Sequence, residues 1–97
     1  MTGLSLSAKT SYMKLVIERP AVKALSRMQP KTASAIIAAL ERIAVNPFDP
    51  HPNVKRLAGS KGGFRFRHGD WRALYRLDRA TNTMVVENVK PRGGAYR

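Results

Sequence analysis

Apolar and polar residues alternate with a period of two along much of the second half of the chain, the pattern of half-buried β-strands. The clearest alternation covers Phe64–His68 and Trp71–Asp78, two segments joined through the tripeptide His-Gly-Asp. A Gly-Asp pair between alternating segments is typical of a β-hairpin turn. Thr83–Lys90 predicts the next strand of a meander. Tyr12–Glu18, which contains Tyr, Val and Ile, predicts a strand near the start of the chain.

Between the first strand and the hairpin the apolar spacing becomes helical. A short helix is predicted around Ala21, Leu25 and Met28, which fall on one helix face. A second helix is predicted over Lys31–Val45, where apolar residues recur at i, i+3, i+4 and i+7. The segment 46–53 contains three prolines and is expected to end this helix in a stiff loop.

The order of these elements, β-α-α-β-β-β, predicts an α+β domain, an antiparallel sheet with two helices packed on one face and the other face open. Residues 12–97 are interpreted as this single domain. Residues 1–11 are small and polar without periodicity and are interpreted as a disordered leader. The basic, glycine-containing segment 54–63 is interpreted as the approach to the hairpin.

Strand parity divides the hairpin into an aromatic face and an arginine face. Phe64 and Phe66 point to one side of their strand, and so do Trp71 and Tyr75 on the next, so we expect these four side chains to pack under the helices. His68 is expected to point away from the arginines and is interpreted as a turn residue. The open face is expected to carry Arg65, Arg67, Arg72, Leu74 and Arg76.

The net charge of the chain indicates what kind of partner the open face binds. The chain of 97 residues has 18 Lys and Arg against 6 Asp and Glu, a formal charge of +12. Residues 1–54 hold 7 basic and 3 acidic side chains, net +4, whereas residues 55–97 hold 11 and 3, net +8. A fold does not need this imbalance, and its self-repulsion opposes folding, so the charge indicates a polyanionic partner.

A solvated strand face, on which basic side chains prevent edge-to-edge aggregation, is the alternative interpretation of the arginines. It explains one arginine as well as a binding role does. It explains less well four arginines on neighbouring strands without an acidic partner among them, because like charges on adjacent strands are destabilising. Arginine also suits phosphate, since its planar guanidinium donates two parallel hydrogen bonds.

Several classes of protein are excluded or disfavoured by composition. Without cysteine the chain forms no disulfide and no cysteine metal site, and no metal or cofactor is expected. No apolar run approaches the ~20 residues of a membrane span, and the N-terminus lacks a signal-peptide pattern. The sequence therefore indicates a cytoplasmic protein.

With these residues in view, the chain resembles the RelE/ParE toxins of bacterial type II toxin–antitoxin systems. The resemblance covers roughly residues 13–97 and is most specific in the hairpin FRFRHGDWRALYRLD and the tail KPRGGAYR. It implies a RelE-like microbial ribonuclease-type fold. RelE-like members are ribosome-dependent endoribonucleases that cut mRNA in the decoding site and so inhibit translation, whereas ParE-like members inhibit DNA gyrase.

The resemblance also implies site residues. The nuclease positions of RelE-like members fall on Arg65, Arg67, Arg72, Arg92 and Tyr96, all filled by compatible types, which favours the RelE-like branch. Contacts with RNA are further expected from Lys55, Arg56, Lys61, Arg76 and Lys90. Two departures stand out: relatives carry lysine at the positions of the first two arginines, and many have a histidine where this chain has Pro91.

Metal-independent cleavage by 2′-hydroxyl attack needs a proton acceptor, a stabilised pentacoordinate phosphorane and a proton donor for the leaving group. Arginines meet the second need but are poor bases. Tyr96 is the favoured titratable candidate. His68 is a weaker one, and Glu87 is expected to pair with a neighbouring arginine. The identity of the general base stays open at this point.

Two other functions remain possible from the sequence: a ParE-like gyrase inhibitor that makes no use of Arg72, Arg92 and Tyr96, and a non-enzymatic nucleic-acid-binding module. The resemblance finally implies a partner, a small acidic RelB-like antitoxin encoded next to the toxin, which would cover the basic surface in a hetero-oligomer and relieve its repulsion.

Overall fold

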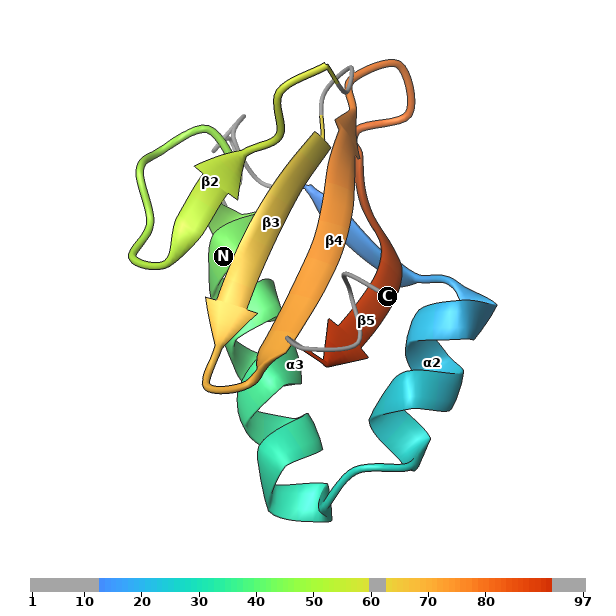
Figure 1. Ribbon diagram of the computed structural model, residues 1–97. Helices are drawn as coiled ribbons and strands as arrows, with labels where there is room; N and C mark the ends of the chain where they lie inside the picture. Colours follow the sequence, from blue (N-terminus) through green and yellow to red (C-terminus); the bar gives the residue numbers. More distant parts are fainter. Residues whose placement is uncertain (1–12, 60–62, 92–97) are drawn as a thin grey trace, which may run out of the picture.

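The computed structural model describes residues 13–59 and 63–91 and shows one five-stranded sheet with two helices on one side (Figure 1). The strands lie in the order β1-β5-β4-β3-β2. The expected leader, residues 1–11, lies outside the described residues. The elements are β1 (Lys14–Ile17), α2 (Arg19–Ser26), α3 (Pro30–Val45), β2 (Val54–Arg56), β3 (Gly63–His68), β4 (Trp71–Asp78) and β5 (Thr83–Pro91).

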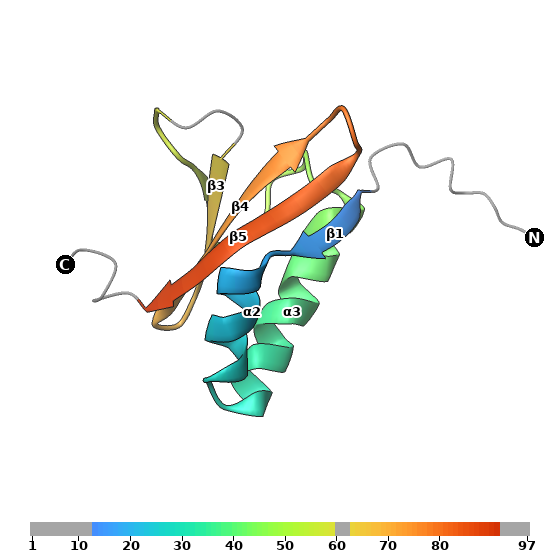
Figure 2. The same ribbon diagram turned by 90° about the vertical axis from the view of Figure 1, so that its right-hand side faces the viewer.

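Both helices begin with a proline in the first turn and bury one apolar stripe. The α2 helix buries Ala21 and Leu25, and α3 buries five residues that include Ile36, Leu40 and Ile43. Both helices lie on the same side of the sheet, as Figure 2 shows, so the described residues leave the opposite sheet face uncovered. Within the described residues no helix is long and apolar enough to cross a membrane.

The hairpin β3–β4 has the predicted two-residue turn. Gly69, the first of the two turn residues, has φ of +58°, which fits a type II′ turn and which a residue with a Cβ adopts at a cost. The turn sets the register that places Phe66 opposite Ala73 and Phe64 opposite Tyr75. The aromatic face of the hairpin therefore faces the helices, as predicted.

Two features of the sheet differ from the expected one, although the α+β class with both helices on one face is confirmed. First, β1 pairs in parallel with β5. The α3 helix returns the chain to the start of β1, where Met13 N donates a hydrogen bond of 2.9 Å to Ala44 O. After α3 the chain enters β2. Each of the next three strands runs antiparallel to the one before it, so β5 runs in the same direction as β1.

Second, the segment interpreted as the approach to the hairpin contains the short strand β2, which pairs antiparallel with β3. Three residues, two of them basic, are too short for an alternation to be recognised. Asn53, with φ of +65°, turns the chain into this strand, and Arg67 N donates a hydrogen bond of 2.9 Å to Asn53 O. Tertiary pairing thus makes a strand where the local pattern predicted none.

Tyr75 is the largest side chain at the centre of the core. It is 2% exposed, and its ring stacks on that of Phe64 with 5.2 Å between the centroids. Trp71, also expected in the core, is partly buried and packs against it. Burial raises the pKa of Tyr75 to about 12, because the core disfavours the charged phenolate.

This shift predicts a pH dependence of stability. The folded state holds the Tyr75 proton more tightly than the unfolded chain, so its contribution is complete below pH 10 and is lost as the pH rises towards 12. Between pH 9 and 11 the free energy of unfolding of the native chain should fall by about 1 kcal/mol more than that of Tyr75→Phe. Urea unfolding at both pH values measures this, and lysines titrate equally in both chains. Parallel pH profiles would contradict the prediction.

Candidate functional site

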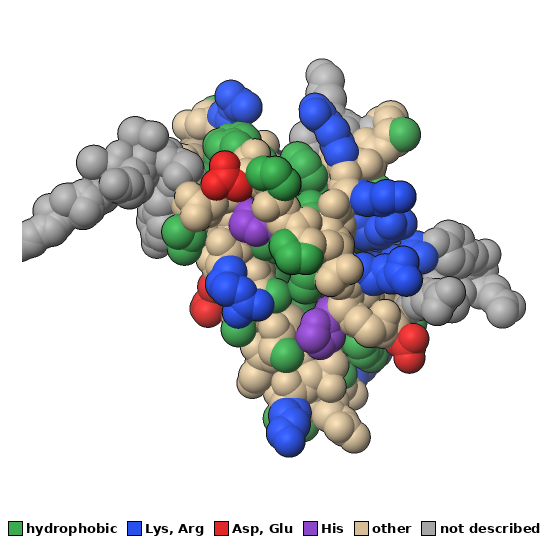
Figure 3. Space-filling view, turned by 90° about the vertical axis from the view of Figure 1, so that its left-hand side faces the viewer, with side chains coloured by type: hydrophobic (Ala, Val, Ile, Leu, Met, Phe, Trp, Pro, Cys, Tyr) green, Lys and Arg blue, Asp and Glu red, His purple; other side chains and the backbone are tan. Residues whose placement is uncertain are grey.

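Basic side chains gather on the open face of the sheet. In Figure 3 they form a column at the right, on the side of the molecule away from the helices. Strand alternation places them there, because the residues between the buried Phe66, Ala73 and Tyr75 point the other way. The cross-strand register then decides which of them are neighbours.

Three cations lie directly opposite one another on adjacent strands. Arg67 of β3 is paired with Arg72 of β4, and Arg72 is paired with Lys90 of β5. We call these three residues the cationic row. Side chains in such directly opposite positions have Cβ atoms about 4.5–5.5 Å apart, so their charges repel across the strands. Arg67 and Lys90 are exposed, which leaves the row accessible to a partner.

A second row runs beside the cationic row. Its members in order are Lys55, Arg65, Leu74 and Asn88. Arg65 is half-buried, and its Nε atom is buried without a hydrogen-bond partner among the described residues. A buried donor without an acceptor costs about 1–3 kcal/mol, which an anion bound at this position would offset. The place of Lys55 on the sheet depends on β2 and could not be read from the local pattern.

Arg76 lies on the same face but is neutralised. Its Nε atom donates a hydrogen bond of 2.8 Å to Glu87 Oε2, and its Nη1 atom lies 4.0 Å from Asp78 Oδ2. A bulge in β5 opposite Leu74 and Tyr75 inserts Glu87 into the ladder. The expectation that Glu87 pairs with an arginine is confirmed, whereas the expectation of four arginines without an acidic partner is wrong for Arg76.

The other predicted site residues lie elsewhere or outside the described residues. Arg56 is paired with Phe64, so it points to the helix side of the sheet and is separated from the cationic row. Lys61, Arg92 and Tyr96 fall outside the described residues. The last described residue, Pro91, ends β5 directly after the cationic row and opposite Trp71.

Both histidines belong to the helix side. His68 follows the parity of Phe66, and the two ring centroids lie 6.2 Å apart. His51 lies in the loop after α3, with its Nε2 atom 2.7 Å from Asn46 O. Neither ring faces the cationic row, which agrees with the interpretation of His68 as pointing away from the arginines.

The open face suits the recognition of a phosphodiester. Arg65, Arg67, Arg72 and Lys90 supply fixed positive charge, and three of them are guanidinium groups with a forked donor geometry. Among the described residues of this face the carboxylates are Glu87 and Asp78, and both interact with Arg76. The described part of the face therefore stabilises negative charge but presents no uncommitted proton acceptor. In residues 13–59 and 63–91 no three His, Asp or Glu side chains group as a metal site.

Comparison with known proteins agrees with this geometry. A family model described as the ParE toxin of the type II toxin–antitoxin system parDE matches residues 15–96. A comparison with curated protein sequences gives no match.

Among solved structures, a chain of the toxin–antitoxin complex RelBE2 from Mycobacterium tuberculosis is 25% identical, with a TM-score of 0.68, and the match covers 84% of this chain and 99% of that one. A chain of the RelE–RelB complex from Pyrococcus horikoshii is 24% identical, with a TM-score of 0.67 and coverages of 86% and 97%. A RelE mutant from E. coli in the free state has a TM-score of 0.74 at 14% identity, with 88% of each chain covered, and shows a shared fold.

Repulsion within the cationic row predicts a stabilising substitution. Arg67→Thr removes the charge opposite Arg72 and introduces a good strand former, so the free energy of unfolding should rise by about 0.5 kcal/mol at low salt. Lys14→Thr is the matched control, because Lys14 lies on a strand opposite the uncharged Thr83. Urea unfolding measures both, and the gain should shrink in 1 M salt through screening. A gain for Arg67→Thr no larger than for the control would argue against the repulsion.

Proposed function

Because the chain belongs to the ParE toxin family of type II toxin–antitoxin systems, we propose that it is a toxin of the RelE-like kind, a ribosome-dependent endoribonuclease that cleaves mRNA in the decoding site and inhibits translation in the cytoplasm. The cationic row is the observation that carries the proposal. It places three positively charged side chains directly opposite one another across three strands, an arrangement that suits a bound anion because the anion lowers their mutual repulsion. A phosphodiester bound across the row supplies that anion.

In the proposed reaction the 2′-hydroxyl of the RNA loses its proton and forms a bond to the adjacent phosphorus, and the bond from phosphorus to the 5′-oxygen breaks. The 5′-oxygen takes up a proton, so the products are a 2′,3′-cyclic phosphate and a 5′-hydroxyl. Arg65, Arg67 and Arg72 stabilise the negative charge of the pentacoordinate phosphorane, a contribution that is often the largest in such reactions. Arg92 and Tyr96 of the tail are proposed to complete the site. Tyr96 is the proposed group that accepts or donates a proton in the reaction. Lys55 and Lys90 are proposed to hold the RNA backbone on either side.

Arginine in place of lysine at positions 65 and 67 shifts the expected source of the rate enhancement. A guanidinium group is a poor proton acceptor, so the chain relies on charge stabilisation and on positioning. Alignment of the attacking hydroxyl with the scissile bond supplies about 7–11 kcal/mol in well-oriented systems. We propose that the ribosome provides this alignment, which makes cleavage dependent on translation and weak on free RNA.

The family also supports an antitoxin partner. The solved structures that the chain resembles include complexes of RelE chains with RelB antitoxins. For this chain we propose an acidic antitoxin encoded by the adjacent gene, since a formal charge of +12 needs a negative partner to approach neutrality.

A gyrase inhibitor of the ParE kind is the second candidate. It is favoured by the description of the matching family model and by the lack of an uncommitted proton acceptor on the described open face. In that case the arginines would serve binding and not catalysis, and Arg72 would be dispensable for toxicity.

The deciding experiment is induced expression in a bacterium, with primer extension across an abundant mRNA. For the native chain we expect growth arrest and cuts within translated codons. Arg72→Ala and Arg92→Ala should each abolish both, because loss of one preorganised charge-stabilising donor lowers such rates by about 10²–10³-fold. Purified protein should cut naked RNA poorly.

Arg19→Ala, an exposed arginine at the start of α2 on the helix side, is the matched control and should keep full toxicity. Growth arrest with intact mRNA, unchanged in Arg72→Ala and accompanied by altered DNA supercoiling, would assign the chain to the gyrase inhibitors instead.

A further inference from the structure

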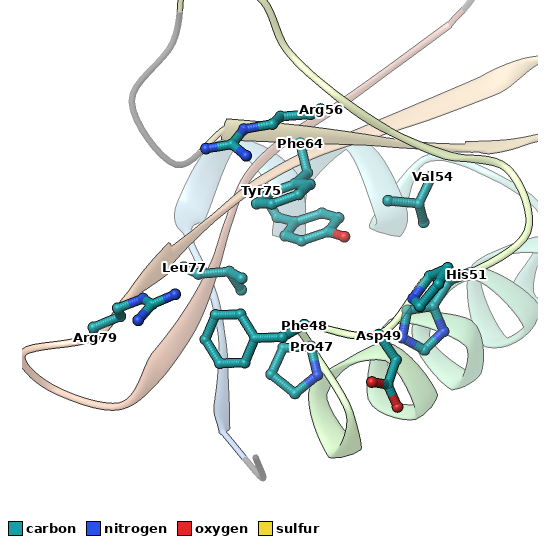
Figure 4. A pocket seen from close by; sticks show the side chains of 11 residues that line it. Pro47, Phe48, Asp49, His51, Val54, Arg56, Phe64, Tyr75, Leu77 and Arg79 are labelled. Atoms are coloured by element: carbon teal, nitrogen blue, oxygen red, sulfur yellow. The ribbon is translucent and has the colours of Figure 1, made fainter.

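An aromatic cavity opens on the helix side of the sheet, away from the cationic row. It has a volume of about 450 Å³ and lies between the sheet and the loop that follows α3 (Figure 4). Phe64, Tyr75 and Leu77 of the sheet form one wall, and Phe48 of the loop lies across from them. The proposed RNA chemistry does not use this cavity.

Two arginines line the same side of the cavity. Figure 4 shows Arg56 and Arg79 at one side, with Asp49 and His51 at the other. The Arg79 guanidinium carbon lies 4.6 Å from the centre of the Phe48 ring, which links the β4–β5 turn to the loop. Asp49 is the one acidic residue among those that line the cavity, so its charge is predominantly positive.

The exposed Phe48 side chain gives the cavity an apolar surface that an apolar side chain of a partner would cover. It is 49% exposed although it belongs to the cavity wall, and it is among the few large hydrophobic residues that the described chain leaves exposed. An exposed aromatic residue beside arginines is the composition found at the centre of protein interfaces, where Trp, Tyr and Arg dominate the binding energy.

We propose that this cavity anchors the acidic antitoxin. A bulky apolar side chain of the antitoxin enters between Phe48 and Phe64, and carboxylates beside it in the antitoxin sequence pair with Arg56 and Arg79. The inference rests on the proposed function for the antitoxin partner, and it adds the place where that partner is held.

Charge and polarity support this occupant over others. The two arginines match carboxylates of an acidic segment. The apolar walls exclude a segment that is acidic throughout, because a carboxylate buried away from the two arginines would have no partner. The Tyr75 oxygen points along the cavity towards His51 (Figure 4). A phenolic hydroxyl keeps its proton at neutral pH and can act as a hydrogen-bond donor, so Tyr75 adds one polar group to the largely apolar cavity wall.

The position of the cavity has a functional consequence. Arg56 and Phe64 face the helix side, whereas their strand neighbours Lys55 and Arg65 face the open side. An antitoxin anchored in the cavity therefore binds the toxin without contacting the cationic row at this anchor. Loss of the anchor should separate the two properties, leaving a toxin that is active and poorly neutralised.

The test uses the full chain and the purified polypeptide encoded by the adjacent gene. The Arg56→Glu, Arg79→Glu double variant should raise the Kd for this polypeptide by roughly thirtyfold, the effect of losing an interface hot spot. Phe48→Ala should weaken binding as well, without a change of charge. Both variants should still arrest growth when expressed alone, and co-expression of the adjacent gene should rescue growth less well than it does for the native chain.

Lys23→Glu, Lys31→Glu is the matched control, with the same change of net charge at two exposed helix positions. Its Kd should change less than threefold, and circular dichroism establishes that each variant is folded. If the two double variants weaken binding equally, the effect comes from net charge alone and the proposal is overturned. Unchanged binding by Phe48→Ala would overturn it as well.

Two further outcomes would also overturn the anchor site. If the folded cavity variants no longer arrest growth, the cavity belongs to the toxic activity. If the native chain does not bind the adjacent gene product, the partner itself is wrong. Failure of the nuclease proposal is distinct from both, because it is read from mRNA integrity in the native chain and leaves the binding measurements unaffected.

Discussion

Burial of one face of the central hairpin against the helices is the constraint on which the rest of the molecule depends. Phe66, Ala73 and Tyr75 are buried side by side, and the tight turn at Gly69 holds the two strands in that register. A slip by one residue would turn the arginines into the core and the aromatic residues into solvent. The packing of the core therefore places every basic side chain of the open face.

The same constraint makes the open face electrostatically unfavourable. The registers of β3 with β4 and of β4 with β5 fix which side chains are neighbours. They place Arg67 opposite Arg72 and Arg72 opposite Lys90. The fold relieves part of the repulsion by inserting Glu87 through a bulge, which neutralises Arg76 at one end of the face. The cationic row keeps three positively charged side chains in directly opposite positions. A surface of this kind lowers stability and suits the polyanionic partner proposed above.

The sheet also separates two surfaces of different chemistry. One face offers fixed guanidinium groups, suited to a phosphodiester and to the charge that develops during its cleavage. The other side holds an aromatic cavity lined in part by arginines, suited to an apolar side chain flanked by carboxylates. The two sides of one five-stranded sheet thus carry the proposed site of the toxic activity and the proposed site of its control, so neither surface has to satisfy both. The chain belongs to the ParE toxin family.

The sequence by itself determined the features that depend on local periodicity. Alternation identified β3, β4 and β5 and the faces of Arg65, Arg67 and Tyr75, because the period of two is a property of each strand alone. Helical spacing identified α3, and the residues of the hairpin and tail pointed to the family. Only the tertiary structure decided what depends on pairing between distant segments. The parallel position of β1, the strand β2, the bulge at Glu87 and the separation of Arg56 from the cationic row all arise from contacts between strands, and no local pattern encodes such contacts. The cavity belongs to the same class, since its walls come from the loop after α3 and from strands that follow it.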